Sequence, residues 1–279
     1  MWLIRARARS ILEVQPRPST VRSPIVTSPV PVVLVHGTRT SSAIWHAQVA
    51  ALEAAGHPTT TIDLPGHGDR TGERFTWEGA VAAIDAAVDA HDAPPLLVGL
   101  SLGGYLSLAY AGRHGHRLAG LMLAGCSTEV RGKPVGLYRD AAHHVTRTLG
   151  LGQGSWHVVT DMLTAIAGYS PLTDLRRLRV PLWVVNGRRD PLRLDERRFL
   201  RAAPGARLTV VPGAGHDVNS HAPTAFNRVL VEALRELTHG VLPALSPRVA
   251  RRARALTPAA LLPAGRLPAP RLPRVPLPV

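Results

Sequence analysis

The segment Ala93–Gly112 (APPLLVGLSLGGYLSLAYAG) runs for twenty residues without a charge, and this feature constrains the fold of the chain most. A helix of that length could cross a bilayer. However, prolines at positions 94 and 95 and glycines at 99, 103 and 104 interrupt it, and neither an aromatic belt nor a second span accompanies it. A buried strand followed by a buried helix explains the same lack of charge. We therefore expect no transmembrane segment, with PLLVGL as the strand and YLSLAYAGRHG as the helix.

Short apolar runs alternate with helical patterns along the chain. In the first helical pattern Trp45, Val49 and Leu52 lie at helical spacing, and Thr76 precedes the second as an N-cap. Such alternation predicts βαβ units, so the expected fold class is α/β, with a mostly parallel central sheet flanked by helices. The expected strands span residues 31–37, 59–63, 95–100, 118–125, 181–187 and 207–211, and the expected helices include 44–55, 77–91 and 224–237.

Composition divides the chain into three parts. Residues 1–28 mix arginine, proline and serine with short apolar patches, which predicts a loosely structured N-terminal extension or edge strands. Residues 29–239 carry the alternating pattern and predict one domain. Within it, residues of about 127–180 contain no strand-like run, which favours an inserted helical cap. Residues 240–279 are rich in proline and arginine and hold no acid, so we expect a disordered tail.

The positive charge belongs to the ends of the chain. Of the net charge of +14, residues 1–30 carry +4 and residues 240–279 carry +7, which leaves +3 for the middle. We therefore expect no specific nucleic-acid partner, although the tail leaves open a contact with nucleic acid or an anionic membrane. The single cysteine, Cys126, excludes an intramolecular disulfide, and no secretory signal is visible. The expected location is the cytoplasm.

The uncharged segment contains GLSLG, which fits the G-x-S-x-G turn that presents a serine nucleophile. On so tight a turn, side chains at Gly99 and Gly103 would collide with the neighbouring backbone, and Ser101 is held in a strained conformation with its hydroxyl exposed. The motif alone is weak. Its position between an expected strand and an expected helix is the context that the motif requires.

Two further residues supply what a nucleophilic serine needs, a base and a carboxylate that orients the base. Asp190 lies just beyond the fifth expected strand in NGRRD, and His216 lies just beyond the sixth in GAGHDVN. Sites in open α/β sheets form at the carboxyl ends of the strands. The sequence therefore predicts a catalytic set of Ser101, Asp190 and His216, in the chain order expected for an α/β-hydrolase.

From about Pro31 to Leu237 the chain resembles a capped α/β-hydrolase. The resemblance rests on His36-Gly37, the loop 63–68 (DLPGHG), Gly99 to Gly103, Gly187 to Asp190, and Gly215-His216. It implies an oxyanion hole made by the backbone N–H groups of Thr38 and Leu102. The Thr38 hydroxyl either adds a third donor or only closes the turn. A serine at position 101 argues against the haloalkane dehalogenases and epoxide hydrolases of this superfamily, which have aspartate there. Leu100 departs from the histidine or glutamine common before the nucleophile.

Several residues compete for roles in this site. Glu129 follows the fourth expected strand and is the alternative orienting carboxylate. His221 lies close to His216 in the sequence but lacks the Gly-x-Gly-His setting, so we expect it to be a surface residue. His67 is expected to structure its loop, and His143 with His144 could bind a metal but lack a further ligand at suitable spacing. We accordingly expect no metal site and no cofactor.

These observations predict a serine hydrolase that cleaves a small or medium-sized apolar carboxylic ester, thioester or lactone through an acyl-enzyme. The expected partner is a small-molecule substrate, and no oligomeric state is predicted. One alternative is a carbon–carbon bond hydrolase of the same fold, in which Arg139 and Arg147 would pair with a substrate carboxylate. The other is a hydrolase-like receptor that binds a ligand without turning it over.

Overall fold

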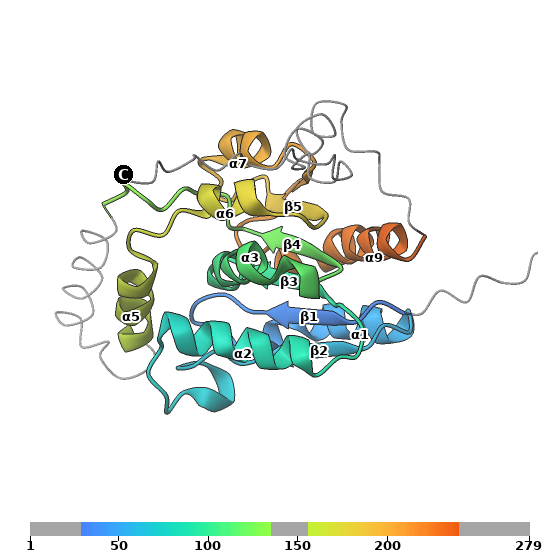
Figure 1. Ribbon diagram of the computed structural model, residues 1–279, viewed down its shortest axis with the longest axis horizontal. Coiled ribbons are helices and arrows are strands. Elements are labelled where there is room, and N and C mark those ends of the chain that lie inside the picture. The colour runs from blue at the N-terminus through green and yellow to red at the C-terminus, as the bar shows by residue number, and fades with distance from the viewer. Residues whose placement is uncertain (1–28, 135–155, 240–279) are drawn as a thin grey trace, which may run out of the picture.

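The computed structural model describes residues 29–134 and 156–239. Its centre is a six-stranded sheet in the order β2-β1-β3-β4-β5-β6, in which every pairing between neighbours is parallel (Figure 1). The predicted fold class and all six predicted strands are thereby confirmed. The strands are β1 (Val32–Val35), β2 (Thr59–Ile62), β3 (Leu96–Leu100), β4 (Gly120–Ala124), β5 (Leu182–Gly187) and β6 (Arg207–Val211).

Successive strand residues point into different cores, because side chains alternate between the two faces of a sheet. On one face, β1 contributes Val33 and Val35 to a cluster with α2 (Trp77–Asp89), α3 (Leu102–His114), α6 (Pro171–Arg177) and α7 (Glu196–Ala202). On the other, Val32 and Leu34 pack with α1 (His46–Ala54) and α9 (Pro223–His239). Both faces of the inner strands are thus covered, which is why these strands read as continuous apolar runs.

The predicted helices form with small changes at their ends. Thr76 caps α2 as expected, since its hydroxyl accepts a hydrogen bond from the N–H of Gly79. The predicted helix 44–55 divides into a 3-10 turn, η1 (Ser42–Trp45), and α1. Its buried side differs from the expected one: Trp45, Gln48 and Leu52 are fully buried, whereas Val49 is only partly buried.

The described part of residues 127–180 contains α5 (Trp156–Ile166) and α6 and no strand. Figure 1 shows α5 beyond the carboxyl ends of the strands, toward which the arrows point. Arg74 donates two hydrogen bonds to Asp161 of α5, which ties this helix to the loop before α2. Glu129 accepts a hydrogen bond of 3.1 Å from Ser170, the residue that precedes α6. A cap over about 127–180 stays a prediction, because residues 135–155 lie outside the described part.

The predicted extension (residues 1–28) and tail (residues 240–279) also lie outside the described residues, as do His143, His144, Arg139 and Arg147. Among the described helices, none combines the length and apolar character that crossing a membrane requires. The uncharged segment is instead β3 followed by α3, whose residues from Leu102 to Ala111 are all buried. The prediction of a buried strand and helix is therefore confirmed.

Candidate active site

Ser101 occupies the sharp turn between β3 and α3. Its backbone is in the left-handed region, with φ of 52° and ψ of −116°. A residue other than glycine pays a steric cost there of about 1–3 kcal/mol, and such conformations concentrate at functional sites. The turn is fixed by the Ser101 N–H, which donates to the Ala124 carbonyl at the end of β4 over 2.8 Å. Ser101 is therefore held at the carboxyl edge of the sheet, at the start of a buried helix.

The glycines on either side of Ser101 let the chain turn this tightly. A Cβ added to Gly99 would lie 2.6 Å from the carbonyl carbon of Gly103 and 2.7 Å from Cα of Gly104. A Cβ added to Gly103 would lie 2.5 Å from the carbonyl oxygen of His36. All three contacts are with backbone atoms, which cannot move aside as a flexible side chain can. The collision expected from the sequence is thus present at both glycines.

The structure brings the three predicted catalytic side chains together. Nε2 of His216 lies 2.8 Å from Oγ of Ser101, and Nδ1 of the same imidazole lies 3.0 Å from Oδ1 of Asp190. Asp190 and His216 sit in the loops after β5 and β6, so three parallel strands deliver these groups to one edge of the sheet. The residues are far apart in the chain and meet only through the parallel sheet.

Asp190 holds His216 in a defined orientation and changes its acidity. The Asp190 side chain is fully buried, and its Oδ1 also accepts a hydrogen bond of 2.8 Å from the N–H of Leu192. The hydrogen bond to Asp190 raises the pKa of His216 above its usual value, against the opposing effect of burial. An imidazole that donates through Nδ1 presents a lone pair on Nε2, toward the serine hydroxyl.

Of the two predicted oxyanion donors, Leu102 directly follows Ser101, and Thr38 directly follows Gly37, which approaches Ser101. Leu102 is the first residue of α3, and the first helical hydrogen bond runs from the Tyr105 N–H to the Ser101 carbonyl. The Leu102 N–H therefore has no partner within the helix and adds to the positive end of the helix dipole. A Cβ on Gly37 would lie 3.3 Å from Cβ of Ser101, which places the loop that carries Thr38 against the nucleophile.

Other side chains hold that loop in place. The turn after β1 is closed by the hydroxyl of Thr40, which donates to the Gly37 carbonyl over 2.9 Å. His36 is fully buried; its Nδ1 donates to the same carbonyl over 2.8 Å, and its Nε2 accepts from the Leu64 N–H over 3.0 Å. Burial lowers the pKa of His36 to about 4, so the ring is neutral near pH 7. His36 thus joins the loop after β1 to the loop after β2.

The competing residues have other partners. Glu129 is buried, but its carboxylate accepts hydrogen bonds from the N–H of Arg131 (3.0 Å) and from Ser170 (3.1 Å) rather than from His216. His221 is exposed, and its Nδ1 accepts from the N–H of Gly215. His67 is buried and bonds the Pro65 carbonyl through Nδ1, as expected for a residue that structures its loop.

Cys126, the one thiol of the chain, also lies near this site. It is buried under α3, where a Cβ on Gly104 would meet its Sγ. Burial, with a further contribution from the charge of Asp190, raises the pKa of the Cys126 thiol. The thiol therefore stays protonated and is a poor nucleophile.

Two polar networks around the site were not foreseen from the sequence. In the first, Asn186 of β5 donates to Ser127 and to Glu196, each over 2.7 Å, and the Asp195 N–H donates to the Ser127 carbonyl. These hydrogen bonds hold the loop after Asp190 against the loop after β4. The signal in the sequence was a lone asparagine in the apolar run PLWVVNG, but its partners are distant in the chain.

In the second network, Asn219 links the His216 loop to the helices after the Thr38 loop. Asn219 lies in α8 (Val218–His221), is fully buried, and donates to the Ile44 carbonyl of η1 over 3.0 Å. Gln48 donates to the Asn219 carbonyl (3.2 Å) and to the side chain of Asn227 in α9 (2.8 Å). The sequence carried only a weak signal for this network, a glutamine next to Val49 in the largely apolar run of residues 44–55.

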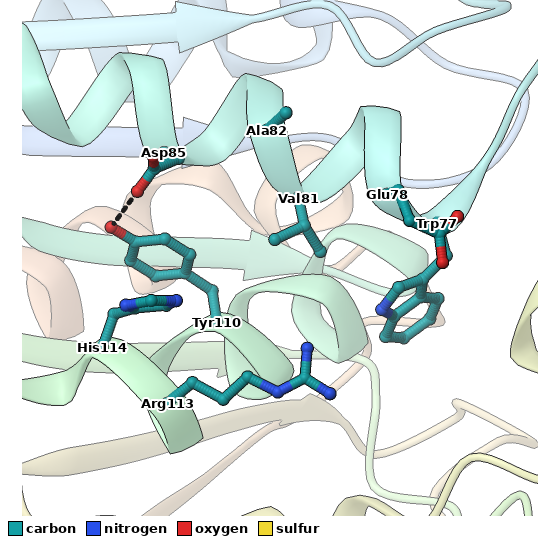
Figure 2. Close-up of a pocket in the computed structure, with 8 residues that line it drawn as sticks. All are labelled: Trp77, Glu78, Val81, Ala82, Asp85, Tyr110, Arg113 and His114. Atoms are coloured by element: carbon teal, nitrogen blue, oxygen red, sulfur yellow. Dashed lines mark hydrogen bonds between the residues drawn. The ribbon is translucent and has the colours of Figure 1, made fainter.

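A hollow of about 340 Å³ lies elsewhere, between α2 and α3 (Figure 2). The Tyr110 hydroxyl donates to Asp85 over 2.9 Å, and the centroid of the His114 ring lies 4.9 Å from that of the Tyr110 ring. None of the predicted site residues lines this hollow, which is bordered by Trp77, Glu78, Val81, Ala82, Asp85, Tyr110, Arg113 and His114. We assign it no part in the reaction.

Known proteins share this fold and part of this sequence. A pimeloyl-(acyl-carrier protein) methyl ester esterase from Neisseria meningitidis serogroup A is 28% identical over 251 residues, covering 76% of this chain and 77% of that protein. A bromoperoxidase from Bacillus anthracis has a similar structure, with a TM-score of 0.64, 20% identity and coverage of 75% of this chain and 92% of that one. A thermophilic esterase from Thermogutta terrifontis has a TM-score of 0.62, 23% identity and coverage of 75% and 90%.

At these identities the two solved structures establish likeness of fold. The family model described as "Alpha/beta hydrolase family" matches residues 32–229, which span the whole sheet and all three predicted catalytic residues. The chain belongs to the alpha/beta hydrolase family and is a hydrolase.

Proposed function

We propose that this protein is a serine hydrolase that cleaves a small or medium-sized, largely apolar carboxylic ester, thioester or lactone through an acyl-enzyme. Ser101 is the nucleophile, His216 the general base and Asp190 the carboxylate that orients the base. The observation that carries the proposal is the unbroken set of short contacts from Ser101 Oγ through the His216 ring to Asp190 Oδ1, at 2.8 and 3.0 Å. A serine hydroxyl becomes an effective nucleophile when a base at this distance accepts its proton.

In the acylation step, Oγ of Ser101 forms a bond to the substrate carbonyl carbon while its proton passes to Nε2 of His216. The carbonyl oxygen becomes an oxyanion. When the intermediate collapses, the bond to the leaving oxygen or sulfur breaks, and the proton on Nε2 passes to that atom. In the second step, Nε2 of His216 accepts a proton from water, and the water oxygen forms a bond to the acyl carbon. The bond from that carbon to Oγ of Ser101 then breaks and the proton on Nε2 returns to Oγ, which releases the carboxylic acid and restores Ser101.

The oxyanion would be stabilised by the backbone N–H groups of Thr38 and Leu102. Support for Leu102 comes from its place in the first turn of α3, and support for Thr38 comes from the contact of Gly37 with Ser101. Donors that are already in place stabilise developing charge without reorganisation, and one such donor is worth about 3 kcal/mol in other enzymes. The buried His36, through its two hydrogen bonds, keeps the Thr38 loop in this position.

An ester substrate is supported by the relative from Neisseria meningitidis, whose name describes a methyl ester esterase. The experiment is a panel of nitrophenyl esters, thioesters and lactones with short and medium acyl chains, given to the wild type and to Ser101→Ala. We expect turnover of at least one class, and a loss of about 10³-fold or more in Ser101→Ala. Ser220→Ala, a change at an exposed serine, is the matched control and should keep full activity.

A diketone acid, a ligand-binding measurement and a fluorophosphonate probe, added to this panel, separate the alternatives. Failure of the wild type on every acyl substrate, together with tight binding of a small ligand, would favour a receptor. Turnover of a diketone acid alone would favour a carbon–carbon hydrolase. Labelling by a fluorophosphonate probe that persists undiminished in Ser101→Ala would contradict Ser101 as the nucleophile.

A further inference from the structure

The positive charge of the described domain is concentrated in one stretch. Residues 170–207 hold ten arginines and four acids, a balance of +6. Residues 29–134 hold seven basic and nine acidic residues, a balance of −2. The basic stretch comprises α6, β5, the loop of Asp190, α7 and the start of β6. Its charge therefore gathers at the β5–β6 end of the sheet.

Most arginines of this stretch are exposed, whereas its acids are buried or partly buried. Asp174 and Asp190 are buried, and Asp195 and Glu196 are partly buried. Eight arginines are exposed, and we call them the arginine face: Arg176, Arg177, Arg179, Arg188, Arg189, Arg197, Arg198 and Arg201. Within the described residues, Arg198 pairs with Asp195 at 3.0 Å and Arg177 approaches Asp174 at 3.9 Å, and the other six form no ion pair. Like charges gathered without partners repel one another, which an anionic partner would relieve.

The arginine face adjoins the proposed active site. The helices α6 and α7 pack against each other at this end of the molecule (Figure 1). Arg188 and Arg189 directly precede the carboxylate that orients His216. The same loop presents Leu192 and Leu194, which are 46% and 64% exposed and are the large exposed apolar side chains of the described residues. The surface thus combines arginines, six of which have no ion-pair partner among the described residues, with a small apolar contact beside the site.

The segments outside the described residues carry no excess of negative charge that could complement the arginine face. Residues 1–28, 135–155 and 240–279 together hold fourteen arginines and only two acids, Glu13 and Asp140. These segments would be repelled by the arginine face. A partner has to bring its own negative charge.

We propose that the arginine face, with Leu192 and Leu194, docks an acidic protein. Arginine pairs with carboxylates through two parallel hydrogen bonds, and leucines offer apolar contact to a folded or helical partner. An interfacial helix in a membrane needs an apolar outer face, but α7 turns Phe199 into the core. Single-stranded nucleic acid is bound by aromatic platforms, and the stretch 170–207 offers only Trp183 and Phe199, both buried.

The test uses the full chain and a fluorescein-labelled peptide of glutamate and leucine, with binding followed by fluorescence anisotropy. Arg197→Glu combined with Arg201→Glu reverses two charges on α7. Arg228→Glu combined with Arg235→Glu makes the same change in net charge at exposed positions of α9, on the other face of the sheet. We expect the α7 pair to weaken binding by about tenfold or more and the α9 pair to leave it nearly unchanged. Binding by the wild type should weaken as salt is added.

Equal weakening by the two pairs would overturn the proposal, because it would mean that total charge or another segment holds the peptide. The proposal would also be overturned if the wild type bound an oligo(dT) strand or phosphatidylglycerol vesicles more tightly than the peptide, and if the α7 pair abolished that binding. Melting temperatures show that the variants are folded. If the reversals unfold the protein, Arg197→Ala with Arg201→Ala, against Arg228→Ala with Arg235→Ala, gives the same comparison. Wild-type ester turnover is measured separately, so a failure of the hydrolase proposal leaves the docking result standing.

Discussion

At the scale of single residues, one carboxylate oxygen determines the state of the proposed base. Oδ1 of Asp190 contacts both Nδ1 of His216 and the N–H of Leu192, and the side chain has no access to water. An amide in its place could keep the contacts but not the charge. The positive imidazole that forms during catalysis would then lose its main stabilisation.

Asp190→Asn tests this role. We expect kcat/KM to fall by about 10³- to 10⁴-fold. The base works only when neutral, so activity falls as the pH drops through the pKa of His216, which in the wild type is raised above 6.5. Without the Asp190 charge that pKa falls, and the acid limb of the kcat/KM profile moves to lower pH. Glu129→Gln, a matched loss of charge in a buried carboxylate, should keep both the rate and the acid limb. The reverse pattern would make Glu129 the orienting group.

At the scale of elements, the turn between β3 and α3 depends on glycines that face backbone atoms. Gly103→Ala would bring its Cβ to 2.5 Å from the His36 carbonyl oxygen and to 2.8 Å from the Val35 carbonyl carbon. We expect a loss of about 3 kcal/mol or more in the free energy of unfolding, measured in urea, because β1 and α3 would have to separate. Gly205→Ala, where a Cβ meets nothing within 4 Å, is the control and should change stability by less than about 1 kcal/mol. Equal losses in both variants would contradict the steric argument.

The hydrogen bonds of Asn219 also act between elements, because they hold the His216 loop against η1 and α1. Asn219→Ala removes the side-chain amide that donates to the Ile44 carbonyl and to Oε1 of Gln48 (3.4 Å), so we expect a loss of about 1–3 kcal/mol in stability. We also expect a fall in kcat with little change in KM, because the imidazole would be less firmly placed.

Asn227→Ala is the matched control for this network. Asn227 bonds the same Gln48 and the Ala47 carbonyl, but it lies in α9 rather than beside His216. It should cost similar stability and leave kcat nearly unchanged. If the two variants lowered kcat equally, Asn219 would be a structural residue only.

The sequence predicted those features that local pattern determines. All six strands were found because a strand buried on both faces reads as an apolar run with a turn at its end, as in PVVLVHG and PLWVVNG. The contacts of Ser101, His216 and Asp190 followed from placing loops at the carboxyl ends of parallel strands. Tertiary partners could not be read in this way: Gln48 replaced Val49 on the buried side of α1 because Asn219 and Asn227 meet it there. The short helices α7 and α8 carry too few residues for a periodic pattern.

At the scale of the whole molecule, the proposed site lies where two packed layers meet. The proposed nucleophile directly precedes α3, which packs on one face of the sheet, while His216 precedes α8 and α9, which pack on the other. His36 is fully buried and ties the loops after β1 and β2 together. Its protonation would therefore act on the stability of the entire domain, since the buried ring cannot take a charge and keep its bond from the Leu64 N–H.

His36 makes global stability depend on pH. Its pKa is about 4 in the folded protein, because of burial, and about 6.5 when unfolded. Between these values the unfolded chain binds more protons, so the free energy of unfolding falls as the pH drops from 6.5 toward 4, by about 2 kcal/mol between pH 7 and pH 5. In His36→Gln this contribution is absent. The free energy of unfolding, measured in urea, should therefore fall by about 2 kcal/mol less between pH 7 and pH 5 than it does in the wild type. The variant should also be less stable than the wild type at pH 7. His46→Gln, the same substitution at an exposed site, should keep the wild-type slope. Identical slopes in all three proteins would mean that other groups govern the acid sensitivity of the fold.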